Sequence, residues 1–225
     1  MYLSPIGRLF AIAIGLLMAI TIHEFSHALV AYRLGDPTAK RMGRLSLNPL
    51  VHLDPLGTLM MVITALTGIG IGWGKPTPVS PWILRPGRRL GMGIVAAGGP
   101  ISNVLLALAL AVVVRVAYAL HLVLPASVIP VLGVIIGLNV GLAAFNLLPL
   151  PMLDGFHILM GIVASIRARW AYDLSYQLER VEPHGPMILL VLILLPRVLR
   201  IDLLGLLVSP VYDLLSRLVS LVLRV

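Results

Sequence analysis

The sequence contains no cysteine and few charged residues. Without cysteine the 225-residue chain forms no disulfide and offers no thiolate ligand, so a metal ion would have to be held by histidine, aspartate or glutamate. Only 12% of the residues are charged and 59% are hydrophobic, which is far from the balance of an ordinary soluble domain. We recognise no soluble regulatory domain, long linker or internal repeat, and we expect a single membrane-embedded domain over 1–225.

Long apolar segments are the main feature of what is present. A helix needs about 20 mostly apolar residues to cross a bilayer. Segments of this kind recur at 6–31, 90–119, 127–148 and 185–222. They predict an all-α polytopic membrane protein with about five to six transmembrane helices.

The region after the first long segment has a different pattern. Residues 38–58 combine basic residues with the turn formers Asn48-Pro49 and Asp54-Pro55, so they suit a β-hairpin or a loop better than a span. Residues 59–72 are apolar but short and rich in glycine, which favours a re-entrant segment over a crossing one.

The net charge of +8 comes largely from basic residues in short loops. Anionic headgroups and membrane topology explain such residues better than nucleic acid does, so we expect a lipid bilayer and no nucleic-acid partner. If 59–72 does not cross, most of the basic residues lie on one side of the membrane. They are Arg33, Lys40, Arg41, Arg44, Lys75, Arg85, Arg88 and Arg89. The positive-inside rule assigns that side to the cytoplasm of a plasma or inner membrane, and it places the polar cluster at 23–27 nearer that side.

The sequence HEFSH at 23–27 lies on the first predicted helix. Histidines at i and i+4 project from one helix face, so His23 and His27 can bind one zinc ion per chain. Glu24 lies beside them and, as a general base, would take a proton from a water that the metal acidifies. The motif therefore indicates hydrolysis by a metal-activated water.

A third zinc ligand has to be a carboxylate or an imidazole, and Asp154 is the best candidate. Of the nine acidic residues, Glu24 and Asp154 are the two that accompany apolar spans and helix-breaking prolines. An ionisable group at membrane depth costs on the order of 2.5–3.5 kcal/mol, which metal coordination would offset. The alternative is that Asp154 only caps a short helix.

Five segments together resemble the site-2 protease family of intramembrane zinc metallopeptidases. They are HEFSH, SLNPLVHLDPLGT, GWGKPTPV, AGGPISN and FNLLPLPMLDG, which fall within about 10–160. The resemblance implies that His23, His27 and Asp154 bind zinc and that Glu24 is the catalytic acid/base. It also implies that Asn146 faces the site and positions substrate or stabilises the oxyanion. A membrane-embedded β element after the zinc helix is a further implication.

The function we expect is cleavage of transmembrane protein or peptide substrates in or near the bilayer. The catalytic core would cover about 6–160, with C-terminal helices over about 161–225. A membrane metal transporter is one alternative, although transporters show internal repeats that we do not find here. A protein that binds transmembrane segments without cutting them is another.

Several other residues have both a functional and a structural interpretation. His52 and His157 are candidates for additional metal ligands. His52 lies in a turn-rich segment and better suits a structural hydrogen bond, and His157, one turn after Asp154, better suits contact with a zinc ligand. Asn146 could instead hydrogen-bond another helix, a common use of asparagine in membranes. The glycines at 98–99 are expected to allow close helix packing.

Overall fold

Among the residues that the computed structural model describes, four helices are long and apolar enough to cross a membrane. They are α1 (Pro5–Arg33), α4 (Arg88–Ala119), α5 (Val128–Asn146) and α9 (Leu203–Leu223). The structure describes residues 3–67, 72–199 and 202–223, and within these ranges it is helical without any β-strand. The all-α fold class is therefore confirmed, whereas the expected number of about five to six spans is not.

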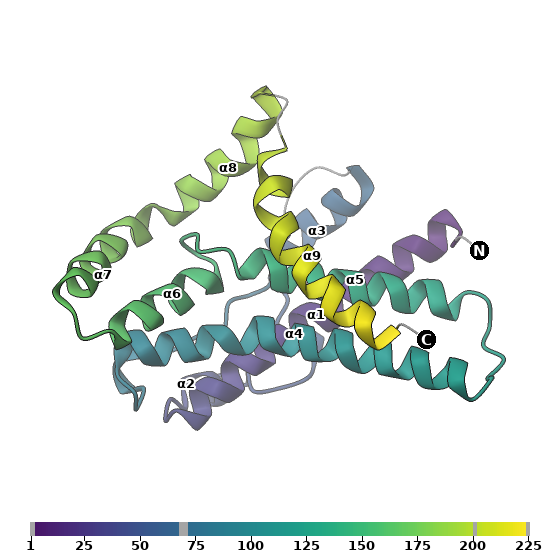
Figure 1. Ribbon diagram of the computed structural model, residues 1–225, viewed down its shortest axis with the longest axis horizontal. Coiled ribbons are helices and arrows are strands. Elements are labelled where there is room, and N and C mark those ends of the chain that lie inside the picture. The colour runs from purple at the N-terminus through teal and green to yellow at the C-terminus, as the bar shows by residue number, and fades with distance from the viewer. Residues whose placement is uncertain (1–2, 68–71, 200–201, 224–225) are drawn as a thin grey trace.

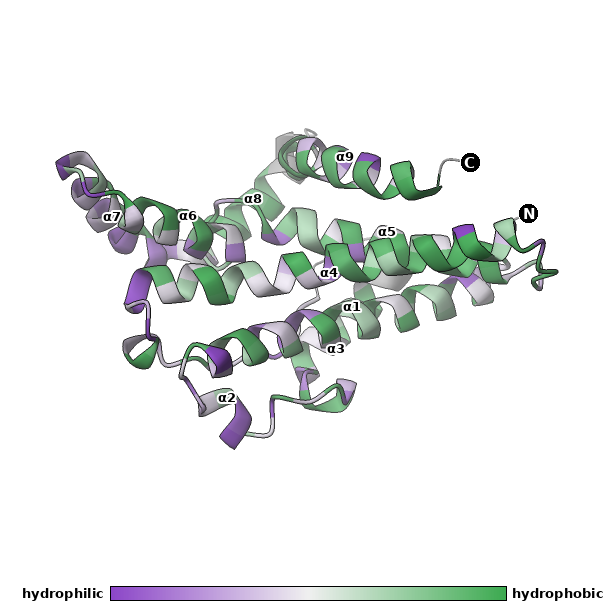
Figure 2. Cartoon of the chain, turned by 60° about the horizontal axis from the view of Figure 1, so that its bottom comes forward, coloured by the Kyte–Doolittle hydropathy of each residue, from purple (hydrophilic) through white to green (hydrophobic). Residues whose placement is uncertain are grey.

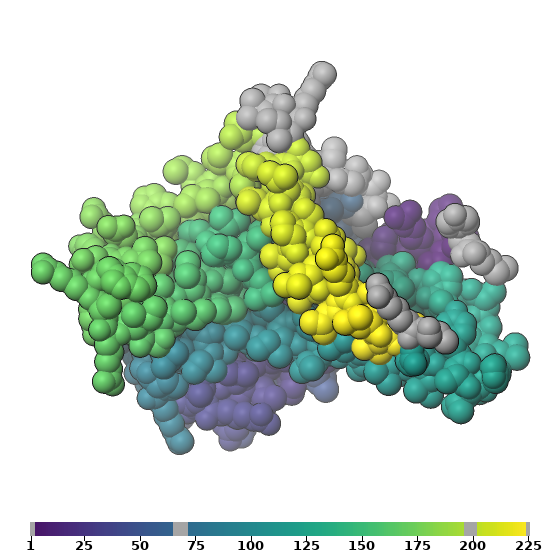
Figure 3. Space-filling view, in the orientation of Figure 1, coloured from purple at the N-terminus to yellow at the C-terminus, as the bar shows by residue number. Residues whose placement is uncertain are grey.

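Helix α4 lies at the centre of the bundle. It packs against α1, α5 and α9, and against α6 (Asp154–Ser165), which lies alongside the first half of α4. Figure 1 shows α4 and α5 lying lengthwise with α9 crossing them, and Figure 3 shows α9 on the outside of both. Buried small side chains form this contact: Ala107, Ala111, Val140 and Val219.

Shorter helices surround this centre. They are α2 (Thr38–Arg41), α3 (Pro55–Thr67), α7 (Arg169–Val181) and α8 (Gly185–Leu199), with 3-10 turns at Pro49–Val51, Pro81–Ile83 and Glu182–His184. Hydrophilic residues gather at the end of the bundle where α2, α7 and the start of α4 lie (Figure 2). Helix α7 is tied to that end because Glu179 accepts two hydrogen bonds from Arg89, each 2.9 Å long.

The prediction of a β-hairpin over 38–58 is wrong. The two residues that were expected to form hairpin turns begin helical turns instead. Asn48 Oδ1 accepts from Leu50 N at 3.0 Å, and Asp54 Oδ1 accepts from Gly57 N at 2.8 Å. The pairing partner of this region lies further along the chain. Leu53 forms an isolated antiparallel bridge with Gly74, next to a 2.8 Å bond from Lys75 N to His52 O.

The prediction of a re-entrant segment at 59–72 falls partly on residues 68–71, which lie outside the described residues. Helix α3 covers the first part with 13 residues. At 1.5 Å per residue a helix of this length extends about 20 Å, shorter than a hydrocarbon core of about 30 Å.

Candidate active site

Close packing of α6 against α4 sets the position of Asp154. A Cβ at Gly93 of α4 would lie 2.9 Å from Gly161 Cα of α6, so the two helices meet backbone to backbone. Asp154 is the first residue of α6, and a Cβ at Gly155 would lie 2.2 Å from Leu147 O at the end of α5. Glycine at these points lets the start of α6 reach the middle of α1.

His23, His27 and Asp154 converge in the interior. His23 Nε2 lies 3.1 Å from Asp154 Oδ2, and His27 Nε2 lies 3.4 Å from Asp154 Oδ1. The two imidazole rings are 4.6 Å apart and nearly perpendicular. One ligand atom from each residue lies within 4.8 Å of the others, and both histidines are buried. The structure therefore brings together the three residues predicted as metal ligands.

Hydrogen bonds on the far side of each ring determine which nitrogen faces Asp154. His27 Nδ1 lies 2.8 Å from the carbonyl oxygen of Val95, and His23 Nδ1 lies 2.7 Å from Asn103 Oδ1. Both partners accept hydrogen bonds, so each Nδ1 carries a proton and donates it. A neutral ring then directs the lone pair of Nε2 toward Asp154, as metal-binding histidines do.

The residues present fit a zinc ion. Lone pairs of His23 Nε2 and His27 Nε2 facing a carboxylate repel it unless a proton or a metal ion lies between them, and two imidazole nitrogens with one carboxylate are a ligand set that zinc prefers. In agreement, Asp154 Oδ2 is buried and accepts no hydrogen bond, although His23 Nε2 is 3.1 Å away. A Cβ at Gly99 would lie 2.5 Å from His27 Nε2, so glycine leaves space beside the cluster.

Glu24 is held by Thr77, which lies in the extended segment between α3 and α4. Thr77 N donates to Glu24 Oε2 at 2.9 Å, and the Thr77 hydroxyl lies 2.8 Å from the same oxygen. Thr77 Oγ1 is also 3.0 Å from the Glu24 carbonyl oxygen. Because Glu24 follows His23 directly, these contacts fix a carboxylate beside the proposed metal ligands.

Asp36 anchors the same extended segment to the end of α1. Its buried carboxylate accepts from Ser80 N at 2.6 Å and from Thr38 N at 2.8 Å. Burial alone would raise the pKa of Asp36, but the hydrogen bonds from Thr38 and Ser80 outweigh it and lower that pKa. Asp36 is therefore a structural residue that keeps Thr77 within reach of Glu24.

The structure does not add the other candidate residues to the cluster. Asn146 lies in the last turn of α5 and donates to Leu142 O of its own helix at 3.0 Å. His52 is fully buried and its Nε2 lies 2.7 Å from Ser46 O, as a structural histidine would. His157 lies on α6 with its ring 6.0 Å from that of Phe156.

Sequence reasoning missed two residues next to the cluster and left a third unassigned. Thr77 lies between two prolines, a context that gave no sign of a contact with Glu24. Asn139 is fully buried and bonded to Asn103, which had no assigned role. Asn103 and Asn139 could have been found from the sequence, since an asparagine inside an apolar span needs a hydrogen-bond partner.

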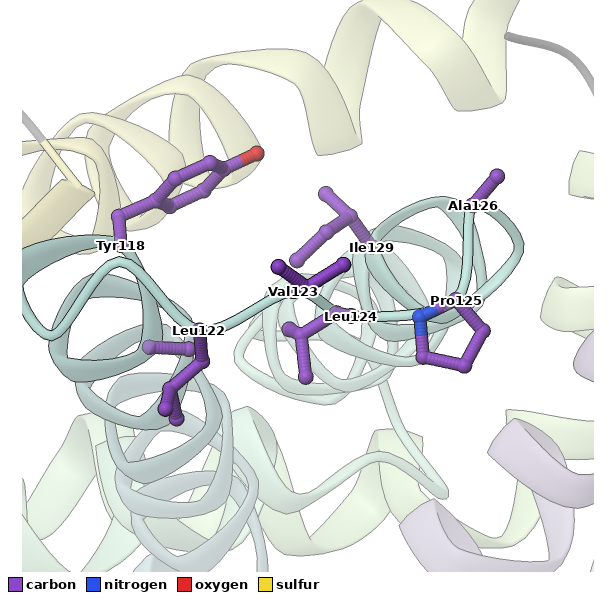
Figure 4. A pocket seen from close by; sticks show the side chains of 8 residues that line it. Tyr118, Leu122, Val123, Leu124, Pro125, Ala126 and Ile129 are labelled. Carbon is purple, nitrogen blue, oxygen red and sulfur yellow. The ribbon is translucent and has the colours of Figure 1, made fainter.

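A separate apolar hollow lies at the other end of α4, where the chain turns into α5. It has a volume of about 280 Å³ and is lined by Tyr118, Leu122, Val123, Pro125 and Ile129, among others (Figure 4). No histidine, aspartate or glutamate lines it, so it offers no group for metal binding or general base catalysis.

Comparison with known proteins finds similarity to peptidases. Residues 114–181 match the family described as "Peptidase family M50". "Putative zinc metalloprotease YwhC" of Bacillus subtilis is 36% identical over 197 residues, which are 85% of this chain and 84% of that protein. No solved structure matches.

Two mycobacterial relatives are also similar. "Putative zinc metalloprotease Rip2" of Mycolicibacterium smegmatis is 35% identical over 156 residues, and Rip2 of Mycobacterium tuberculosis is 33% identical over 157. Each alignment covers 68% of this chain and 58% of the relative, so this chain spans little more than half of Rip2.

Proposed function

The chain belongs to peptidase family M50, as its resemblance to site-2 proteases predicts, and is an intramembrane zinc metalloprotease; on this premise we propose that His23, His27 and Asp154 bind the zinc and that Glu24 is the catalytic acid/base. The family implies membrane-protein substrates in a lipid environment. These matches favour neither a membrane metal transporter nor a protein that binds transmembrane segments without cutting them.

The observation that carries this proposal is the convergence of two imidazole Nε2 atoms on the two oxygens of one buried carboxylate. Three protein ligands leave a position open for water, as catalytic zinc sites require. Zinc held there supplies a Lewis acid that makes water nucleophilic near neutral pH.

Glu24 performs the proton transfers in the proposed reaction. Its Oε2 is engaged by Thr77, which favours Oε1 as the oxygen that accepts the proton of the attacking water. The water oxygen bonds to the carbonyl carbon of the scissile peptide, the carbon–nitrogen bond breaks, and the proton passes from Glu24 to the leaving nitrogen. Each proton and electron pair is accounted for without a further reactant.

Asn146 is proposed to contact the substrate. It ends α5 eight residues before Asp154, and its amide is a preorganised donor that suits the oxygen of the scissile carbonyl. The amide nitrogen carries two hydrogens, so it can donate one to substrate while the other stays bonded to Leu142 O. Replacement by alanine should then reduce the rate of cleavage without removing zinc.

The proposed location is a plasma or inner membrane, with the site nearer the cytoplasm. Supporting it, hydrophilic residues gather at the bundle end formed by α2, α7 and the start of α4 (Figure 2). Basic residues at 40–44 and 88–89 belong to this end, and the positive-inside rule assigns such an end to the cytoplasm. We further propose that substrates are cut in or near their transmembrane segments.

Zinc content of ligand variants tests the proposed site. Purified wild type should carry one zinc ion per chain, whereas Asp154→Ala, His23→Ala and His27→Ala should carry far less, because two remaining ligands bind zinc weakly. His157→Ala, one turn along α6, is the matched control and should keep its zinc. Loss of zinc from His157→Ala together with retention in Asp154→Ala would reverse the assignment.

A further inference from the structure

A chain of buried amide groups connects His23 to helices α4 and α5. Asn103 of α4 lies 2.7 Å from His23 Nδ1 through its Oδ1, and its Nδ2 donates to Asn139 Oδ1 of α5 at 2.9 Å. Asn103 Nδ2 also donates to Ala19 O at 2.9 Å, and Asn139 Nδ2 donates to Ile135 O at 2.9 Å. Both asparagines are fully buried.

The direction of every bond in this chain follows from its two ends. The carbonyl oxygens of Ile135 and Ala19 can only accept, so the amide nitrogens of Asn139 and Asn103 must face them. The oxygen of Asn103 is then the atom that faces His23, and His23 Nδ1 must donate to it. The other tautomer of His23 would set two acceptors against each other in a buried site.

We propose that Asn103 and Asn139 are positioning residues that hold His23 in the tautomer and ring orientation needed to bind zinc. This inference rests on the proposed zinc site. The two histidines differ in this respect, because His27 is oriented by the main-chain oxygen of Val95 and His23 by a side chain. Substitution of Asn103 should therefore loosen one zinc ligand and leave the other in place.

The rate of zinc release tests the proposal. The zinc-loaded full-length protein in detergent micelles is mixed with excess chelator, and release is followed in wild type, Asn103→Leu and Asn139→Leu. Leucine fills a similar volume without hydrogen-bonding groups. Loss of a hydrogen-bond partner of a metal ligand typically reduces metal affinity 10–100-fold, so Asn103→Leu should release zinc about 10–100-fold faster. Asn139→Leu should show a smaller acceleration, since Asn103 keeps its bond to Ala19 O.

A cobalt spectrum separates a positioning role from general destabilisation. The visible absorption of Co²⁺ depends on its ligands, so the cobalt-loaded Asn103→Leu protein should show a shifted band while remaining folded. Ser102→Ala is the matched control, because the Ser102 hydroxyl contacts main-chain oxygens, those of Gly99 and Ile22. Its zinc release and cobalt spectrum should match wild type.

The outcomes separate failure of this inference from failure of the zinc site. Equal release rates and spectra in wild type and Asn103→Leu would overturn the positioning role. If Asn103→Leu does not fold, an unchanged release rate in Asn139→Leu would overturn it instead. Wild type without zinc, or His23→Ala with undiminished zinc, would contradict the zinc assignment itself.

Discussion

The two halves of α4 are both apolar, but they use different small residues. In the first half, glycines at 91, 93, 98 and 99 face α6, α1 and the Leu84 side chain, and Asn103 follows them. In the second half, Ala107, Ala111, Val114 and Ala117 are the buried residues, and α5 and α9 cover this part.

Gly99 in the first half borders the proposed metal ligands, whereas the alanines of the second half pack the helices together. Glycine occurs where a main chain or an imidazole ring comes too close for a Cβ, as at Gly93 and Gly99. Alanine occurs where only apolar side chains meet, as at Ala107 and Ala111. Substitutions in the first half should therefore affect metal binding and cleavage, whereas those in the second half should affect stability.

The largest effect is expected from Gly99→Ala. The new Cβ would lie 2.5 Å from His27 Nε2 and 2.6 Å from His23 Cε1, so both rings must move. Misplacement of catalytic groups by about 1 Å costs about 100-fold in rate, and cleavage should fall at least that far with loss of zinc. Activity and zinc content are measured on the same sample.

The matched control for this prediction is Gly141→Ala on α5, where a Cβ meets nothing within 4 Å. This variant should keep its zinc and its activity. Equal activity in Gly99→Ala and Gly141→Ala would show that the first half of α4 has no special relation to the metal ligands.

A smaller effect is expected from Thr77→Val, which removes the hydroxyl bond to Glu24 Oε2 but keeps the bond from Thr77 N. Proton transfer by a positioned group contributes typically 10²–10⁴-fold, and partial loss of its position should lower kcat about 10-fold with zinc unchanged. Thr77→Ser restores the hydroxyl and should recover most of the rate. A loss of zinc in Thr77→Val would contradict a role limited to Glu24.

In the second half, Ala107→Leu should reduce stability without changing the chemistry. Ala107 is fully buried against Ala111, Val140 and Val219, so extra methylenes overpack the contact of α4 with α5 and α9. Overpacking costs about 1–3 kcal/mol, measured as a lower thermal midpoint in detergent. Cleavage per folded molecule should match wild type. Loss of zinc from the folded variant would contradict the claim that the second half of α4 affects only stability.

The smallest effect is expected from Glu179→Gln on α7, the residue that accepts hydrogen bonds from Arg89 at the start of α4. Hydrogen bonds from the Arg89 guanidinium lower the pKa of Glu179, so its stabilising contribution is present above the ordinary glutamate pKa. That contribution is lost as the pH falls through the lowered pKa, and protonation then makes wild type resemble the variant. A partly exposed ion pair contributes about 0.2–1 kcal/mol.

Thermal unfolding at neutral and acidic pH checks the contribution of Glu179 to stability. Wild type and Glu179→Gln should differ at neutral pH and converge in acid, while Asp173→Asn, an exposed position on the same helix, should follow wild type at neutral pH. A difference that grows in acid would contradict the sign of the effect.

The sequence predicted the parts of the site that follow helical periodicity. His23 and His27 share a helix face by spacing alone, and Asp154 stood out as an acidic residue after helix-breaking prolines. The hairpin over 38–58 was wrong because Asn48 and Asp54 cap helical turns as readily as they close a hairpin. The contacts of Thr77 and Asn139 join residues far apart in the chain, and no local pattern encodes such pairs.

The most direct test of the account compares wild type with Glu24→Gln on a panel of detergent-solubilised model transmembrane substrates, with zinc measured in both. The account predicts that both proteins hold about one zinc ion per chain, that wild type cleaves, and that Glu24→Gln does not, since glutamine cannot accept the proton. Cleavage by Glu24→Gln at the rate of wild type would contradict it.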